Sequence, residues 1–120
     1  MILSIDTTES QKTRVFLKSS KGKVVDSQVK ERKYGSQTLL PQILVIFKKN
    51  KLKLDDLESI EVNPGPGSYT GIRVGVAVAN ALSWALDLKI NDKKKGELVY
   101  PVYSEQKREA FKTNEASSQT

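Results

Sequence analysis

The fold of this chain depends on the stretch Asn63-Pro64-Gly65-Pro66-Gly67-Ser68-Tyr69-Thr70-Gly71-Ile72-Arg73-Val74-Gly75. Before it, residues 59–62 alternate polar and apolar side chains, which is typical of a half-buried strand. After it, apolar residues recur at the spacing of three and four positions that marks a helix. The stretch therefore predicts a strand, a glycine-rich turn and a helix in direct succession.

The predicted helix carries a stripe with almost no side chain, because Gly71, Gly75, Ala79 and Ser83 recur every fourth position. Each glycine inside a helix costs roughly 1 kcal/mol relative to alanine, so the stripe needs an explanation. Two remain open. The helix packs closely on its own sheet, or it is approached closely by a partner helix.

The glycine turn also has two interpretations. Ser68 or Thr70 can cap the helix, and the exposed N–H groups at its start could hold an anion. However, the turn does not end in the Lys-Ser/Thr of a phosphate-binding P-loop, and Gly65, Gly67 and Gly71 do not fit G-x-G-x-x-G. We therefore favour a tight structural turn.

The same stretch resembles the signature G-P-G-S-[FY]-T-G-[LI]-R-[IV]-G of the bacterial TsaB (YeaZ) family. Its matched positions include Gly65, Gly67, Ser68, Thr70 and Arg73. Residues 2–8 are similar to the family's opening I-L-A-I-D-T-S, and residues 36–43 resemble its S-x-x-L-L-P-x-I helix. The resemblance extends over residues 1–88.

The resemblance implies an α/β lobe of the ribonuclease-H-like, actin-like kind: a mixed sheet with an antiparallel three-stranded meander and two main helices. It implies a non-catalytic dimerisation or scaffold subunit of the machinery that makes threonylcarbamoyladenosine in tRNA. The implied partners are a TsaD-type catalytic paralogue or a second copy of the chain, a TsaE-type ATPase, and tRNA through the complex. No cofactor is expected, and ATP would bind only at a partner interface.

In the actin-like superfold the turn after the first strand faces the nucleotide phosphates, so Asp6, Thr7 and Thr8 would form a vestigial phosphate loop. The residues themselves favour a different interpretation. The loop lacks glycine, and Glu9 adds a second negative charge. We expect an ordinary turn stabilised by the Asp6 and Thr side chains. Residues 2–5 before it form a nearly continuous apolar run, which predicts a central strand covered on both faces.

Residues 13–17 and 23–29 alternate with period two, and the turn at 19–22 predicts a hairpin with Gly22 in a left-handed conformation. Ser36 or Thr38 can cap the next helix, with Pro41 in or just after its first turn. That helix has an apolar face wider than one sheet needs. We assign a partner interface to this face and to the small-residue stripe, namely Leu39, Leu40, Ile43, Phe47, Gly71, Gly75, Ala79 and Ser83.

Composition excludes several functions. The 120 residues contain neither cysteine nor histidine, so we expect no disulfide, no catalytic residue and no metal site, and a peptidase is poorly supported. The net charge of +6 permits a basic face for nucleic acid, but we favour a solvated, solubilising surface as its explanation. No apolar stretch approaches 18 residues, so no membrane association and a cytoplasmic protein are expected.

The predicted domain is a lobe at residues 1–103, followed by a disordered tail at 104–120. A last strand is expected at 98–103, and Pro101 suggests that it lies at a sheet edge or at a strand start. A second actin-like lobe, which members of the family carry, is expected to be missing. Two alternatives remain: a weak nucleotide-binding actin-like module, and a self-associating protein without a role in tRNA modification.

Overall fold

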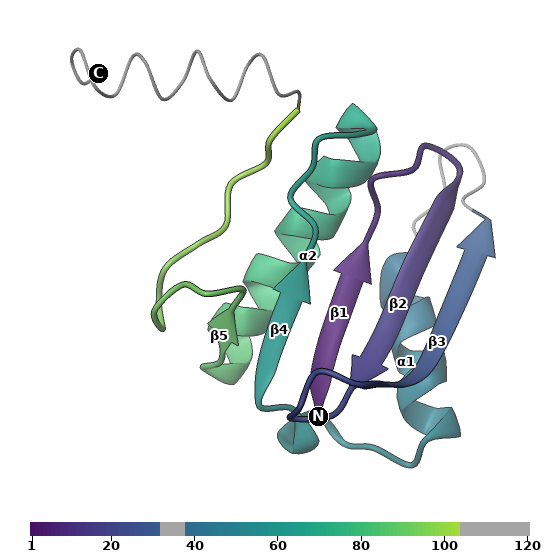
Figure 1. Ribbon diagram of the computed structural model, residues 1–120, viewed down its shortest axis with the longest axis vertical. Coiled ribbons are helices and arrows are strands. Elements are labelled where there is room, and N and C mark those ends of the chain that lie inside the picture. Colours follow the sequence, from purple (N-terminus) through teal and green to yellow (C-terminus); the bar gives the residue numbers. More distant parts are fainter. Residues whose placement is uncertain (32–37, 104–120) are drawn as a thin grey trace.

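A computed structural model describes residues 1–31 and 38–103. Within them, one sheet has the strand order β3-β2-β1-β4-β5, and its strands are β1 Ile2–Asp6, β2 Lys12–Lys18, β3 Val24–Glu31, β4 Ser59–Val62 and β5 Lys89–Ile90. The first three strands form an antiparallel meander, whereas β4 runs parallel to β1 and β5 parallel to β4 (Figure 1). The predicted fold class, a mixed actin-like sheet with a three-stranded meander, is confirmed.

The β2–β3 hairpin closes as its sequence predicts. Gly22 has φ +84°, which is in the left-handed region. The Gly22 amide donates to the Ser19 carbonyl at 2.8 Å, and the Ser19 amide donates to the Lys23 carbonyl at 2.8 Å. The two paired strands are slightly longer than the alternating segments of the sequence.

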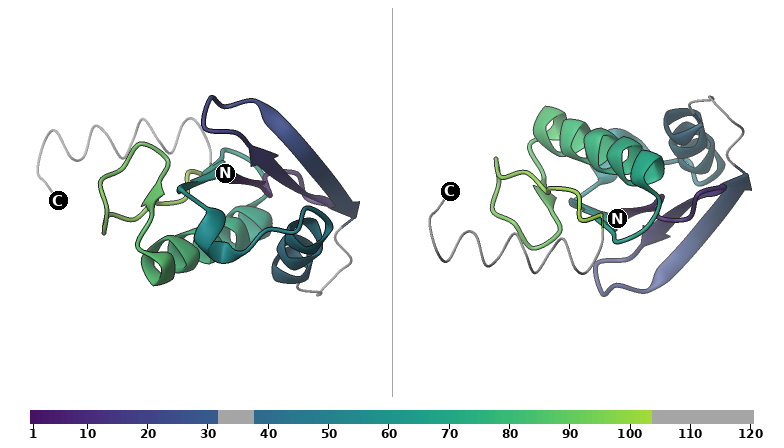
Figure 2. Two further views of the ribbon diagram at one scale, coloured as in Figure 1. Left: turned by 90° about the horizontal axis from the view of Figure 1, so that it is seen from below. Right: turned by 90° about the horizontal axis from the view of Figure 1, so that it is seen from above.

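Two helices, α1 (Leu39–Lys49) and α2 (Tyr69–Leu86), cover the same face of the sheet (Figure 2). α1 packs on β2 and β3, and α2 packs on β1, β4 and β5. Pro41 lies in the first turn of α1, where its missing N–H costs no hydrogen bond. Thr38 precedes the helix, but its side chain makes no capping bond, and Ser36 lies outside the described residues.

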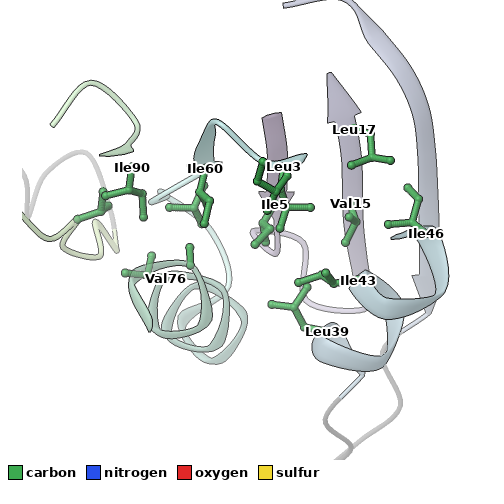
Figure 3. Close-up of a cluster of buried hydrophobic side chains, with 14 of the residues drawn as sticks. Leu3, Ile5, Val15, Leu17, Leu39, Ile43, Ile46, Ile60, Val76 and Ile90 are labelled. Carbon is green, nitrogen blue, oxygen red and sulfur yellow. The ribbon is translucent and has the colours of Figure 1, made fainter. Parts of the chain in front are cut away.

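The core forms between this helix layer and the sheet (Figure 3). Strand residues that point toward the helices are buried, among them Leu3, Ile5, Val15, Leu17 and Ile60. They meet the apolar sides of the helices, which contribute Leu39, Ile43, Ile46, Ile72 and Val76. Burial of these side chains is the main stabilising contribution that the fold can supply.

The expectation that β1 is covered on both faces is wrong. Its side chains alternate between buried and partly exposed, because both helices lie on one side and β1 is shielded on the other side only by its neighbours. There the Lys18 ammonium and the Glu61 carboxylate are 2.9 Å apart. This polar face resembles that of an antiparallel sheet with one solvated side.

The strand expected at 98–103 is also wrong. This segment forms no strand and runs along α2, where the Asn80 side chain pairs with both backbone groups of Val99 at 2.9 Å. Further on, the Val102 amide donates to the Pro64 carbonyl at 2.7 Å. The last strand is instead β5, which has only two residues. The predicted tail at 104–120 lies outside the described residues.

Candidate functional site

The glycine turn, residues 63–68, is a junction of three chain segments. A Cβ at Gly67 would lie 2.6 Å from the Thr8 carbonyl oxygen in the turn after β1. A Cβ at Gly65 would overlap the Val102 carbonyl oxygen, and Gly65 also has φ +111°. Both glycines therefore allow the chain's own backbone to approach closely.

Backbone N–H groups at the start of α2 also have hydrogen-bond partners within the chain. The Ser68 hydroxyl accepts a hydrogen bond from the Gly71 amide at 3.3 Å, which makes Ser68, not Thr70, the capping residue. The Ser68 amide donates to the Thr8 carbonyl at 2.7 Å. The space that a phosphate would need beside the glycines is thus taken by protein backbone, as expected of a structural turn.

Thr7 connects this junction to the small-residue stripe of α2. It is 1% exposed, and its hydroxyl donates to the Gly71 carbonyl at 2.6 Å. A Cβ at Gly75 would overlap the Thr7 Oγ1 atom and lie 3.2 Å from its Cγ2 atom. Gly75 therefore serves close packing of α2 on its own sheet, the first of the two explanations given by the sequence.

Asp6 forms the turn predicted for it. Its Oδ1 atom accepts hydrogen bonds from the Thr8 amide at 2.9 Å and the Thr8 hydroxyl at 2.7 Å. The Asn63 amide group donates to Oδ2 at 3.3 Å. Partial burial alone would raise the pKa of Asp6, but these hydrogen bonds and the nearby Arg14 charge together lower it.

This lowered pKa makes stability depend on pH. Because Asp6 is more acidic when folded, it stabilises the fold above its unfolded-state pKa of 3.8, and this contribution is lost as the pH falls through the folded-state pKa.

We expect Asp6→Asn to reduce the loss of unfolding free energy in acid, measured by urea titration at several pH values. Asp55→Asn is the control, because exposed Asp55 has no hydrogen bond among the described residues. If the free energy of unfolding fell equally in acid for the wild type and for Asp6→Asn, Asp6 would not contribute to the pH dependence.

The second candidate is the outer helix surface, which we define as the side chains of α1 and α2 that point away from the sheet. The exposed residues of the two helices are Leu40, Pro41, Leu44, Val45, Lys48 and Lys49 on α1, and Tyr69, Thr70, Arg73, Ala77, Ala81, Trp84 and Ala85 on α2. Leu44 is 63% exposed and Trp84 is 78% exposed. α1 has no charge before Lys48, and Arg73 is the only charged residue of α2. Such apolar, uncharged exposure is typical of a surface that binds another protein.

A shallow groove of about 400 Å³ lies on α2 within this surface. Thr70, Arg73, Val74, Ala77 and Val78 line it. The lining is mostly apolar, and Arg73 is its one charged residue. The described residues contain no cluster of acidic side chains that could hold a metal, and neither described helix could span a membrane.

The structure corrects the predicted interface residues. Seven of the eight are buried in the chain's own core, and the exception is Leu40, which is 51% exposed. The seven are Leu39, Ile43, Phe47, Gly71, Gly75, Ala79 and Ser83. Ser83, for example, donates its hydroxyl to the Leu88 carbonyl at 2.8 Å. Their burial follows from the sheet lying against this side of both helices.

Sequence reasoning missed Leu44, Ala77, Ala81 and Trp84, which lie on the opposite side. A usable signal was present, since residues 69–86 contain one charge in 18 residues. A helix exposed only to water ordinarily carries charges along its outer face. Because the outer face of α2 has only one charge, exposure to solvent alone does not explain its composition.

Sheet order, helix placement and the turn after β1 define the class as a lobe of the actin-like, ribonuclease-H-like fold. YeaZ from Pseudomonas aeruginosa has this fold as well, with a TM-score of 0.66 at 24% identity over 85% of this chain and 44% of that one. The family TsaD, tRNA N6-adenosine threonylcarbamoyltransferase, matches residues 23–91. The chain belongs to this family, and several of the relatives that it resembles are named TsaB.

Two relatives illustrate the match. The tRNA threonylcarbamoyladenosine biosynthesis protein TsaB of Buchnera aphidicola (Baizongia pistaciae) is 40% identical over 68 residues, which is 49% of this chain and 31% of that protein. TsaB of Bacillus subtilis is 38% identical over 60 residues, 50% of this chain and 26% of that protein. The aligned part of the chain thus spans about a third or less of the length of these relatives.

Proposed function

We propose that this chain acts in tRNA threonylcarbamoyladenosine biosynthesis as a non-catalytic subunit that pairs with a TsaD-type protein through its outer helix surface. The names of the relatives supply the process. The observation that carries the pairing is the uncharged, apolar exposure of Leu40, Leu44, Ala77 and Trp84 on the two helices that cover the same face of the sheet. Covering such a surface is favourable in proportion to the apolar area removed from water.

A scaffold role agrees with the chemistry of the glycine turn. The space beside Gly67 and Gly65 is occupied by backbone atoms of Thr8 and Val102, respectively. The Asp6 carboxylate is engaged by Thr8 and Asn63. Any ATP in the assembly would accordingly bind at a partner interface, and tRNA and a TsaE-type ATPase would be engaged through the complex.

Leu44→Asp tests the pairing. Leu44 is 63% exposed, so the substitution should leave the melting temperature nearly unchanged. A desolvated carboxylate without a partner is costly at an interface, so we expect loss of co-elution with the TsaD-type protein of the same organism in size-exclusion chromatography.

The matched control is Val24→Asp, because Val24 is an apolar residue, 50% exposed, that lies on β3 and belongs to neither helix. This variant should co-elute like the wild type. Normal co-elution of the Leu44→Asp protein would exclude the outer helix surface as the interface. Absence of a wild-type complex would exclude the proposed partner.

A further inference from the structure

The α2 part of the outer helix surface contains one charge, Arg73, and its position suggests what the partner must supply. Arg73 is exposed on α2 beside Val74 and Ala77, and it lines the groove with them. α1 and α2 contain no Asp or Glu at all. Arg73 is thus the one charge on α2, and the other cations of the outer helix surface, Lys48 and Lys49, lie at the far end of α1.

The Arg73 side chain is held in place by aromatic contacts. Its guanidinium carbon lies 5.3 Å from the centroid of the Tyr69 ring, and Nη1 is 3.4 Å from the Tyr69 hydroxyl. The Tyr69 ring in turn packs on Tyr103, with 4.6 Å between ring centroids. Among the described residues no carboxylate lies within ion-pair distance of Arg73. The guanidinium is therefore preorganised, and most of its five donors have no partner among residues 1–31 and 38–103.

This arrangement limits which proteins can cover the surface. A guanidinium that loses its water at an interface must gain an anionic partner, because an unpaired buried charge costs several kcal/mol. If the outer helix surface is the interface, as proposed above, we infer that Arg73 selects a partner that places a carboxylate opposite it. The planar fork of donors suits a bidentate contact with an Asp or Glu side chain.

The same argument disfavours a second copy of the chain as the partner. Pairing of two outer helix surfaces brings together only apolar residues, Arg73 and the terminal lysines of α1, since neither helix carries an acid. The nearest acid past the end of α2 is Asp87, whose carboxylate lies 3.6 Å from the Lys95 ammonium. Arg73 therefore favours a different protein with a complementary acidic residue over self-association.

The test is the affinity of the whole chain for the TsaD-type protein, measured by isothermal titration calorimetry. Arg73→Gln should weaken binding at least about 30-fold, since removing one member of a buried charge pair leaves the other unpaired. Arg73→Lys should fall between Gln and wild type, because it keeps the charge but loses the planar fork. Lys89→Gln, which removes an exposed cation from β5, is the control and should bind normally. Melting temperatures should be nearly equal in all four proteins.

Charge reversal identifies the partner residue. Arg73→Glu should abolish binding, and changing one exposed acid of the TsaD-type protein to Lys should restore it. Normal binding by Arg73→Gln, while Leu44→Asp abolishes binding, would overturn the inference and leave the proposed pairing intact. Absence of binding by the wild-type chain would overturn both. A wild-type homodimer that dissociates on Asp87→Asn would show that the carboxylate comes from a second copy, which also overturns it.

Discussion

Gly75→Ala is expected to lower the free energy of unfolding by roughly 2–4 kcal/mol, although alanine is the better helix former by about 1 kcal/mol. The new Cβ would overlap Thr7 Oγ1, so the helix must move away from the sheet or Thr7 must change rotamer. Overpacking typically costs about 1–3 kcal/mol. Breaking the buried Thr7–Gly71 hydrogen bond adds about 1–3 kcal/mol. The steric cost therefore outweighs the gain in helix propensity.

A double-mutant cycle isolates this contact. In a Thr7→Ala background the Oγ1 and Cγ2 atoms are gone, and the nearest remaining Thr7 atom is the Cβ at 3.2 Å from the new methyl group. Gly75→Ala should then cost much less than in the wild type, measured by urea denaturation. Ala77→Gly controls for helix propensity, because Ala77 is exposed on the same helix. An equal cost of Gly75→Ala in both backgrounds would disprove the contact with Thr7.

This contact shows why sequence periodicity predicted the elements better than their packing. Strands of four or more residues and both helices follow from the spacing of apolar residues, which is a local property. Periodicity also identifies residues that share a helix face, but it does not say which face meets the sheet. In α2 the stripe that includes Gly75 competes with a second small stripe at Ala77, Ala81 and Ala85. Only the approach of Thr7, which is far away in the sequence, decides between them.

Two other features could not be predicted for related reasons. β5 has two residues, so it contains no period, and its pairing with β4 depends on where α2 ends. Residues 98–103 have strand-like composition, but Val99 is bonded to the Asn80 side chain of α2. In both cases a contact between distant segments overrides local propensity. The turns at Asp6 and Gly22 were predicted correctly because each is closed by its own side chains or backbone.

The burial of the small-residue stripe leads to the second large effect, from Ala79→Leu. Ala79 is fully buried, at 0% exposure, and faces the sheet from the middle of α2. Three additional carbon atoms have no space there, so we expect a loss of about 1–3 kcal/mol, or more if β4 is displaced. Ser83→Leu should behave in the same way, because it also removes the bond to the Leu88 carbonyl. Both variants should melt well below the wild type.

Ala81→Leu is the matched substitution on the other side of the same helix. Ala81 is exposed on the outer helix surface, so the added side chain points into solvent and the melting temperature should stay within a few degrees of the wild type. Binding to the TsaD-type protein should instead weaken, because the larger residue keeps the two surfaces apart. Thermal melts and titrations of the two alanine variants thus separate packing on the sheet from contact with a partner. A folded, stable Ala79→Leu protein that fails to bind would reverse the assignment of the two helix faces.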